Sequence, residues 1–130
     1  MKLFYRGKDG GPESHVWGYW LIEWKPVISI ALLRLEDGTR EAYHSHAFNA
    51  ISWLLTGKLV EYYQDNANWP TTYWPSLIPI ITKRDTFHKV KSVGRSWALT
   101  IRGPWATTWH EYLPAEDRHR ILTSGRQEVA

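Results

Sequence analysis

The chain contains no cysteine, and this absence excludes several kinds of site at once. Without thiols there are no disulfides, no thiolate metal ligands and no thiol nucleophile, while the redox compartment stays open. No apolar run approaches the ~18 residues of a membrane-spanning helix, and the first residues, MKLFYRGKDGG, hold no apolar stretch long enough for a signal peptide. We therefore expect a soluble, cytoplasmic protein with no membrane partner.

An excess of one charge is also missing. The formal net charge is only +3, and the basic residues are scattered, which indicates solvated strand edges before a surface for anionic ligands or nucleic acid. Aromatic side chains are abundant, with nine tryptophans whose wide rings can line a sheet-walled interior as readily as a core. Because these rings are interleaved through the strand-like segments and basic residues do not cluster, stacking on single-stranded nucleic acid is the least favoured interpretation.

Short strand-like segments follow one another along the chain. Segment 26–36, PVISIALLRLE, is rich in β-branched and aliphatic residues and stops at the turn signal Asp37-Gly38, and a hairpin-like turn is expected at Thr56-Gly57. Only 14–24 is ambiguous between helix and strand, and 64–75 is the most loop-like stretch. The other segments with strand character are 39–46, 48–57, 58–63, 76–82, 87–92, 96–103 and 105–113.

About eight short strands with frequent turn signals predict an all-β sandwich or barrel. A chain of 130 residues is enough for one hydrophobic core and too short for two. We therefore expect a single domain over 1–130, with a barrel core over about 26–112 and a polar C-terminal tail over 113–130.

Two histidines stand one residue apart in a predicted strand. Because strand side chains alternate between faces, His44 and His46 point to the same side with adjacent imidazoles. Each neutral imidazole offers one nitrogen lone pair, so the pair can begin a metal site. Taken alone, the pair is weak evidence for a metal site, because histidines at surface positions of strands are common.

The segment GTREAYHSHAFNAISWLLTG around this pair resembles the first conserved motif of the cupin family. Gly38, His44, His46 and Gly57 match that motif in register, and Ala50 stands in the slot of its glutamate. The resemblance implies an antiparallel cupin double-stranded β-helix, or jelly-roll barrel, with His44 and His46 as metal ligands. The alanine implies either a three-histidine site or the loss of a functioning site.

The second cupin motif is much weaker. In the corresponding segment KRDTFHKVKS only His88 keeps its place, while Lys83, Asp85 and Ser92 depart from the pattern. The resemblance implies that His88 is the third metal ligand, and the alternative is a half-exposed strand residue. The later run RSWALTIRGPWATTWHEY is similar to the end of small bacterial and phage cupins of unassigned role, from which no activity carries over.

A three-histidine site leaves the charge of a divalent metal uncompensated and coordination positions open. This favours Fe(II) with O₂ and a chelating substrate, and it resembles the site of thiol dioxygenases, which are cupins that also lack the glutamate. Zn, Ni or Mn fit the same ligands. The His-x-Asp pattern of 2-oxo-acid-dependent oxygenases is absent, because position 46 is His.

Groups that contact a substrate have to come from the barrel lining. Phe48 shares the side of the histidine pair by strand parity. Tyr62 and Trp97 are candidate walls, with core packing as the commoner role of such rings. Arg102, just before the Gly-Pro break, would clamp a carboxylate or phosphate if it pointed inward, and otherwise lies on the surface. His110 is either an extra ligand or base, or an exposed strand residue.

The first functional hypothesis is a dioxygenase-like, metal-dependent oxidoreductase that acts on a small polar substrate. The alternative is a non-catalytic cupin that binds a small, nucleotide-like ligand in its barrel. An isomerase would need a general base, and the sequence shows no His–Asp or His–Glu dyad, which counts against that third class. By analogy with cupins we also expect a homodimer, because exposed strands and tryptophans need covering.

Overall fold

The computed structural model describes residues 1–9, 14–38, 43–44, 46, 48–63, 69–84, 86–106, 108–113 and 118–123. Within these ranges the side chains of 43–44, 108–113, 118–120 and 122–123 lie outside the description. In the described part of the chain no helix is long and apolar enough to cross a membrane.

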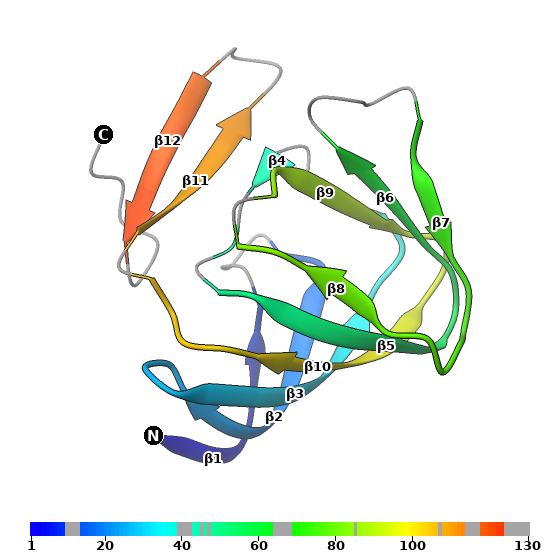
Figure 1. The fold of residues 1–130 in the computed structure, drawn as a ribbon. Coiled ribbons are helices and arrows are strands. Elements are labelled where there is room, and N and C mark those ends of the chain that lie inside the picture. Colours follow the sequence, from blue (N-terminus) through cyan, green and yellow to red (C-terminus); the bar gives the residue numbers. More distant parts are fainter. Residues whose placement is uncertain are drawn as a thin grey trace.

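Two antiparallel β-sheets form the fold (Figure 1). The lower sheet in this view has the strand order β1 (Lys2–Lys8), β2 (Val16–Trp24), β3 (Ile28–Leu35), β10 (Ser96–Arg102), β5 (Ala50–Thr56) and β8 (Ile80–Thr82). The upper sheet has the order β12 (Arg118–Thr123), β11 (Thr108–Leu113), β4 (Tyr43–His44), β9 (His88–Ser92), β6 (Leu59–Tyr63) and β7 (Thr71–Tyr73). The all-β, antiparallel prediction is confirmed.

From β3 onward the chain passes repeatedly from one sheet to the other. Strands β3, β5, β8 and β10 lie in the first sheet, and the strands between them in the sequence lie in the second. This winding is the jelly-roll expected from the sequence. It also means that residues from both sheets face a shared interior.

Gly57 turns the chain from β5 into β6. Its φ of +94° lies in the left-handed region, and a Cβ built on it would stand 2.7 Å from the Cα of Ser96, so only glycine fits there. The sequence correctly predicted a turn at Thr56-Gly57, but the hairpin is wrong. The strands on either side belong to different sheets, because β6 pairs with β7 and β9 instead of β5.

The two regular elements of the N-terminal region, β1 and β2, are both strands. The helical alternative for 14–24 is therefore wrong. Along β2 the buried residues Gly18 and Trp20 alternate with the half-buried Trp17 and Tyr19, which is the period of a strand. Strand β7 lies within the stretch expected to be loop, and β12 lies in the expected tail. The strands therefore extend beyond the range 26–112 at both ends.

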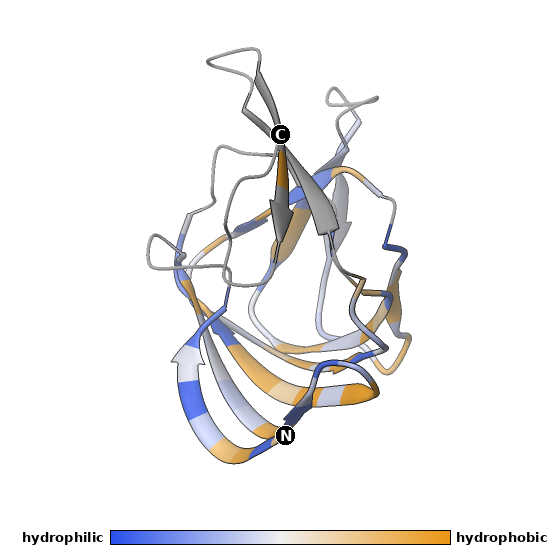
Figure 2. Cartoon of the chain, turned by 90° about the vertical axis from the view of Figure 1, so that its left-hand side faces the viewer, coloured by the Kyte–Doolittle hydropathy of each residue, from blue (hydrophilic) through white to orange (hydrophobic). Residues whose placement is uncertain are grey.

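The core lies between the two sheets. Leu54 and Ala98 of the first sheet cluster with Leu59 of the second, and Val90 packs against them. Along β10 every second residue is buried, from Ser96 to Arg102. Figure 2 shows the corresponding alternation of hydrophobic and hydrophilic bands along the strands. Strand parity thus determines which side chains reach the interior.

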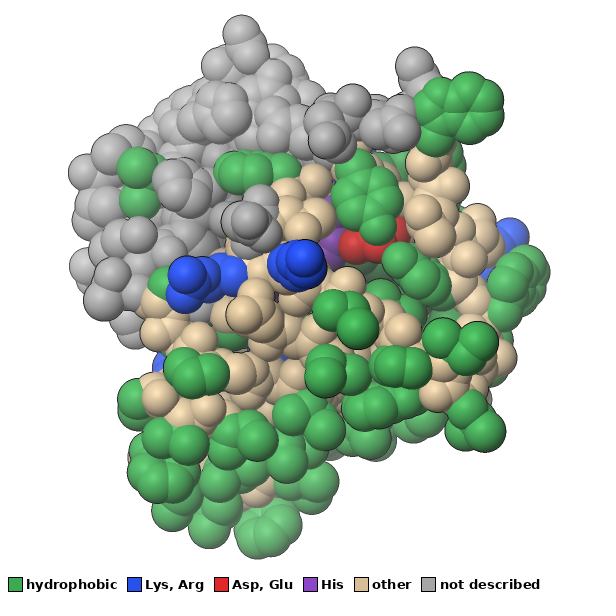
Figure 3. Space-filling view, viewed as in Figure 1, with side chains coloured by type: hydrophobic (Ala, Val, Ile, Leu, Met, Phe, Trp, Pro, Cys, Tyr) green, Lys and Arg blue, Asp and Glu red, His purple; other side chains and the backbone are tan. Residues whose placement is uncertain are grey.

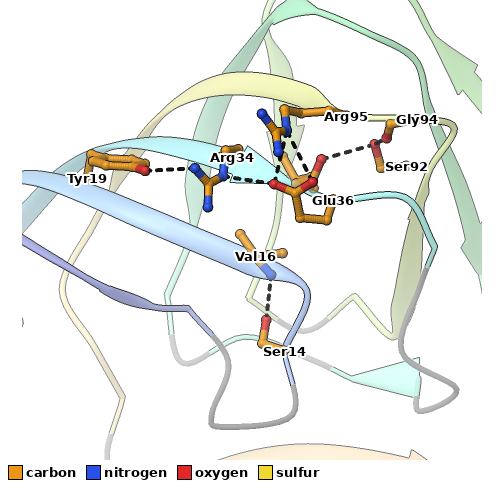
Figure 4. A network of polar contacts seen from close by, with 9 residues as sticks. Ser14, Val16, Tyr19, Arg34, Glu36, Ser92, Gly94 and Arg95 are labelled. Atoms are coloured by element: carbon orange, nitrogen blue, oxygen red, sulfur yellow. Dashed lines mark hydrogen bonds and ion pairs between the residues drawn. The ribbon is translucent and has the colours of Figure 1, made fainter.

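A polar network ties β2 and β3 to the turn before β10 (Figure 4). Glu36 lies 2.8 Å from Nε of Arg34 and 3.1 Å from Nε of Arg95, and Arg34 donates to the hydroxyl of Tyr19 at 3.1 Å. The side chain of Arg95 is 57% exposed, so its ion pair adds little stability. The network mainly orients the strand ends.

Candidate functional site

Two of the predicted histidine ligands meet in the interior. The Nε2 atoms of His46 and His88 are 2.7 Å apart, and their rings lie edge to face with centroids 4.9 Å apart. His88 begins β9, is only 3% exposed, and is the backbone partner of His44 in β4. The side chain of His44 lies outside the described residues, so its role as a ligand stays a prediction.

Glu61 anchors the other side of the His88 ring. The carboxylate is 4% exposed, and its Oε2 contacts Nδ1 of His88 in a short hydrogen bond. Its Oε1 accepts hydrogen bonds from the hydroxyls of Tyr63 at 2.6 Å and Tyr73 at 2.7 Å. Glu61 and Tyr63 lie in β6 and Tyr73 in β7, so two neighbouring strands hold the acceptor of the His88 proton.

These contacts decide the charge of the carboxyl group. Burial alone raises the pKa of Glu61, but the hydrogen bonds from His88, Tyr63 and Tyr73 outweigh it and hold that pKa below its usual value. Burial and the hydrogen bond to Glu61 raise the pKa of the Tyr73 phenol. Glu61 is therefore an ionised acceptor, and the proton between it and His88 belongs to Nδ1.

This tautomer leaves a lone pair on Nε2 of His88, the atom that faces His46. For a metal–nitrogen bond of about 2.1 Å, nitrogens at adjacent octahedral positions are about 3.0 Å apart. The observed 2.7 Å is a hydrogen-bond distance between the two imidazoles, and it is about 0.3 Å shorter than this spacing. A carboxylate on the far nitrogen is also the common support of a metal-ligating histidine. Both features fit a metal ion, although no group of three or more His, Asp or Glu among the described residues is arranged to hold one.

In Figure 3 acidic and histidine side chains are visible together in one small patch, with hydrophobic side chains on one side and a basic side chain on the other. Phe48, 5% exposed, contacts the His46 ring with centroids 5.0 Å apart, and both residues lie in the connection between β4 and β5. Ala50 is buried beside Phe48 and pairs with the inward-facing Arg102. The slot of the family glutamate therefore lies on the inner face and offers no ligand atom.

The two candidate wall residues lie away from this cluster. Tyr62 alternates with the buried Glu61 and stacks with Lys89 on the other face of its sheet, 5.8 Å from Nζ to ring centroid. Trp97 alternates with the buried Ala98 and contacts Tyr19, with ring centroids 5.7 Å apart. The structure thus does not bring either ring to the histidines. His110 lies in β11, and its side chain is outside the described residues.

Arg102 points inward, but its guanidinium is already bound to a carboxylate of the chain itself, that of Asp9. Its Nη1 and Nη2 donate to the two carboxylate oxygens of Asp9 at 2.9 and 2.6 Å. The guanidinium also lies 4.5 Å from the Phe48 ring centroid. The sequence analysis expected an inward Arg102 to clamp a carboxylate or phosphate of a substrate, and it missed Asp9, the carboxylate of the chain itself 93 residues away. The substrate-binding role of Arg102 stays a prediction.

Glu61 is the residue that the sequence analysis missed. The absence of a His–Glu dyad, which counted against acid–base chemistry, is wrong, because His88 and Glu61 form one. The two residues are 27 positions apart on different strands, so no local motif links them. One signal was available: within KLVEYY, Glu61 shares the parity of Leu59 and Tyr63 and so had to point inward.

The chain passes repeatedly between two antiparallel sheets and carries a histidine pair on the inner side. These features, together with the similar solved structures, define a small domain with the cupin fold. No family model matches the chain, and no curated protein matches it in sequence. Solved structures do. A sugar phosphate isomerase from a cupin superfamily, from Silicibacter pomeroyi, is 14% identical, with a TM-score of 0.66 over 99% of this chain and 92% of the other.

Two further structures show the same similarity. A cupin superfamily protein from Desulfitobacterium hafniense is 18% identical, with a TM-score of 0.56 over 74% of this chain and 84% of the other. The EutQ protein of Clostridium difficile is 13% identical, with a TM-score of 0.59 over 78% of this chain and 94% of the other. At such identities the likeness establishes the fold, and the chemistry has to be argued from the site.

Proposed function

We propose that this protein is a metal-dependent cupin whose divalent ion is held by His46 and His88 together with His44. One observation carries the proposal: the Nε2 atoms of His46 and His88 converge to 2.7 Å while buried Glu61 holds the proton on the far nitrogen of His88. Fe(II) is the first candidate, because three neutral imidazoles suit it, and Zn, Ni and Mn fit the same donors.

Each protein group has a separate task at this centre. Glu61 fixes the His88 tautomer and orients its ring, and Tyr63 and Tyr73 keep Glu61 ionised in a buried position. Phe48 packs against His46 and excludes water from that side of the ring. The ion, when bound, would supply a Lewis acid with open positions for a small polar substrate and O₂.

We propose a dioxygenase-like oxidation as the reaction. The support is the ligand set. Ala50 offers no carboxylate to neutralise the ion, so the ion keeps open coordination positions and its positive charge for anionic or chelating ligands. A cupin that only captures a small ligand is the alternative without turnover. The homodimer expected by analogy also stays a prediction.

The His88–Glu61 pair supports a second candidate, acid–base catalysis of an isomerisation. An imidazole oriented by a buried carboxylate is a competent general base through its free nitrogen. One similar structure is described as a sugar phosphate isomerase. The two candidates need the same Nε2 lone pair of His88, so an ion bound there removes the base, and the two are experimentally separable.

Metal analysis of the purified protein beside the His46→Ala and His88→Ala variants tests the centre. We expect about one ion per wild-type chain and a loss in both variants, with the exposed His15→Ala as the matched control. Metal content equally low in all four proteins after supplementation with Fe(II) or Zn would refute it. Oxygen uptake with thiols and small acids then separates oxidation from capture, and metal-independent turnover that needs His88 would support the isomerase candidate.

A further inference from the structure

Arg102 is a buried cation inside the barrel. It is 3% exposed at the end of β10, on the face that also carries Ala98 and Thr100. Its guanidinium lies 4.5 Å from the ring centroid of Phe48 and 5.0 Å from that of Trp20. Two aromatic faces thus replace water around the charge, and a buried guanidinium in such surroundings requires an anion.

The anion present is the carboxylate of Asp9. This residue directly follows β1, at the start of the connection to β2, and its side chain is 24% exposed while that of Arg102 is 4% exposed. The pair therefore lies at a boundary, with the arginine on the protein side and the carboxylate on the solvent side. Asp9 is held by backbone contacts as well, since its amide donates to the carbonyl of Val16 at 2.9 Å and its carbonyl accepts from Ser14.

The guanidinium has binding capacity that Asp9 does not use. Asp9 meets the two terminal nitrogens end-on, and no atom of the described residues accepts a hydrogen bond from the buried Nε of Arg102. A guanidinium offers five N–H donors in a fixed plane that matches carboxylates. An anion free to adjust its position could use the Nε edge, which the tethered Asp9 leaves unsatisfied.

We propose that Arg102, flanked by Phe48 and Trp20, is a binding site for a small carboxylate, and that Asp9 occupies this site as a built-in competitor. A ligand carboxylate enters from the solvent side when the Asp9 side chain turns away. Because Asp9 is tethered, its high effective concentration weakens the binding of any free carboxylate in the wild-type protein.

The site neighbours the histidine cluster without depending on it. The Phe48 ring contacts both the His46 ring, at 5.0 Å between centroids, and the Arg102 guanidinium. A ligand bound at Arg102 therefore lies one aromatic ring away from His46. The inference needs no metal ion, so it stands or fails separately from the proposed metal centre.

The test compares the wild type with Asp9→Ala and with Asp37→Ala. Asp37 is a suitable control, because it is a second loop aspartate that accepts a backbone N–H, from Gly94 at 2.8 Å, far along the chain from Arg102. Each protein is titrated with sodium acetate against sodium chloride at equal ionic strength. The readouts are the ¹H–¹⁵N cross-peak of Arg102 Nε and the Tm.

We expect saturable acetate binding to Asp9→Ala, with a Kd at least tenfold lower than for the wild type, a shifted Arg102 Nε signal and an acetate-specific rise in Tm. Asp37→Ala should behave like the wild type. If Asp9→Ala is unfolded in chloride, acetate should restore the folded spectrum. Equal effects of acetate and chloride on Asp9→Ala, folded or unfolded, would overturn the proposal and leave the Arg102–Asp9 pair as an anchor of the N-terminal strands.

Discussion

Replacing Glu61 by glutamine tests how the fold prepares His88. The carboxylate accepts three hydrogen bonds, from His88, Tyr63 and Tyr73. In Glu61→Gln the amide oxygen can still accept from the two tyrosines, but the amide nitrogen then faces His88 and can only donate. Nδ1 of His88 must become the acceptor, which moves the proton to Nε2 and removes the lone pair that faces His46.

The size of the effect follows from this change of tautomer. Loss of the supporting partner of a ligating histidine lowers metal affinity by about 10–100-fold, or about 1.4–2.7 kcal/mol. Without metal, the exchange of a charge-assisted hydrogen bond for a neutral one in a buried site should cost about 1–3 kcal/mol of unfolding free energy. Glu61→Gln should therefore lower both the metal affinity and the free energy of unfolding, although the substitution hardly changes the volume of the side chain.

Metal affinity is measured by titrating Zn²⁺ against a competing chelator, stability by urea unfolding, and the tautomer by the ¹⁵N shifts of the His88 ring. Glu36→Gln is the control, since that carboxylate is 33% exposed and binds arginines outside the site. A folded Glu61→Gln protein with wild-type Zn²⁺ affinity, or with the His88 proton still on Nδ1, would refute the reasoning.

Three further predictions concern the frame of the site. Gly57→Ala should lower the free energy of unfolding in urea by about 3 kcal/mol or more, because it combines a left-handed φ with a clash against Ser96. An unchanged free energy of unfolding would contradict the turn assigned to Gly57. Phe48→Ala should cost about 3–5 kcal/mol by the same assay, as expected for a buried ring, and a loss below 1 kcal/mol would show that the ring is not packed. Burial and the hydrogen bond to Glu23 raise the pKa of Tyr5 above its unfolded value, so the stability that Tyr5 adds is present below about pH 10 and is lost as pH rises beyond it. The difference in unfolding free energy between wild type and Tyr5→Phe should therefore shrink above pH 10, and a constant difference would rule out this linkage.

Local patterns predicted the parts of the fold that depend on neighbours along the chain. Runs such as 28–35 and 96–102 are strands because their alternation buries every second side chain, and that period is written in the sequence. Phe48 contacts His46 although both residues lie between β4 and β5, outside any strand, so parity does not explain that contact. At β2 the pattern was ambiguous because tryptophan and tyrosine occupy both faces, and pairing with β1 and β3 decided it.

The sequence by itself determined the strands between residues 26 and 113 other than β7, the turn at Gly57 and the candidate histidines, because backbone conformation and side-chain parity are local properties. Only the tertiary structure decided which sheet each strand joins, and with it the partners of the buried charges. Glu61 supports His88 and Asp9 meets Arg102 because strands distant in the chain become neighbours in space. A buried charge needs a partner in the interior, and in both cases that partner comes from a distant segment of the same sheet, β9 for Glu61 in β6 and the end of β1 for Arg102 in β10. No spacing along the chain encodes these pairings.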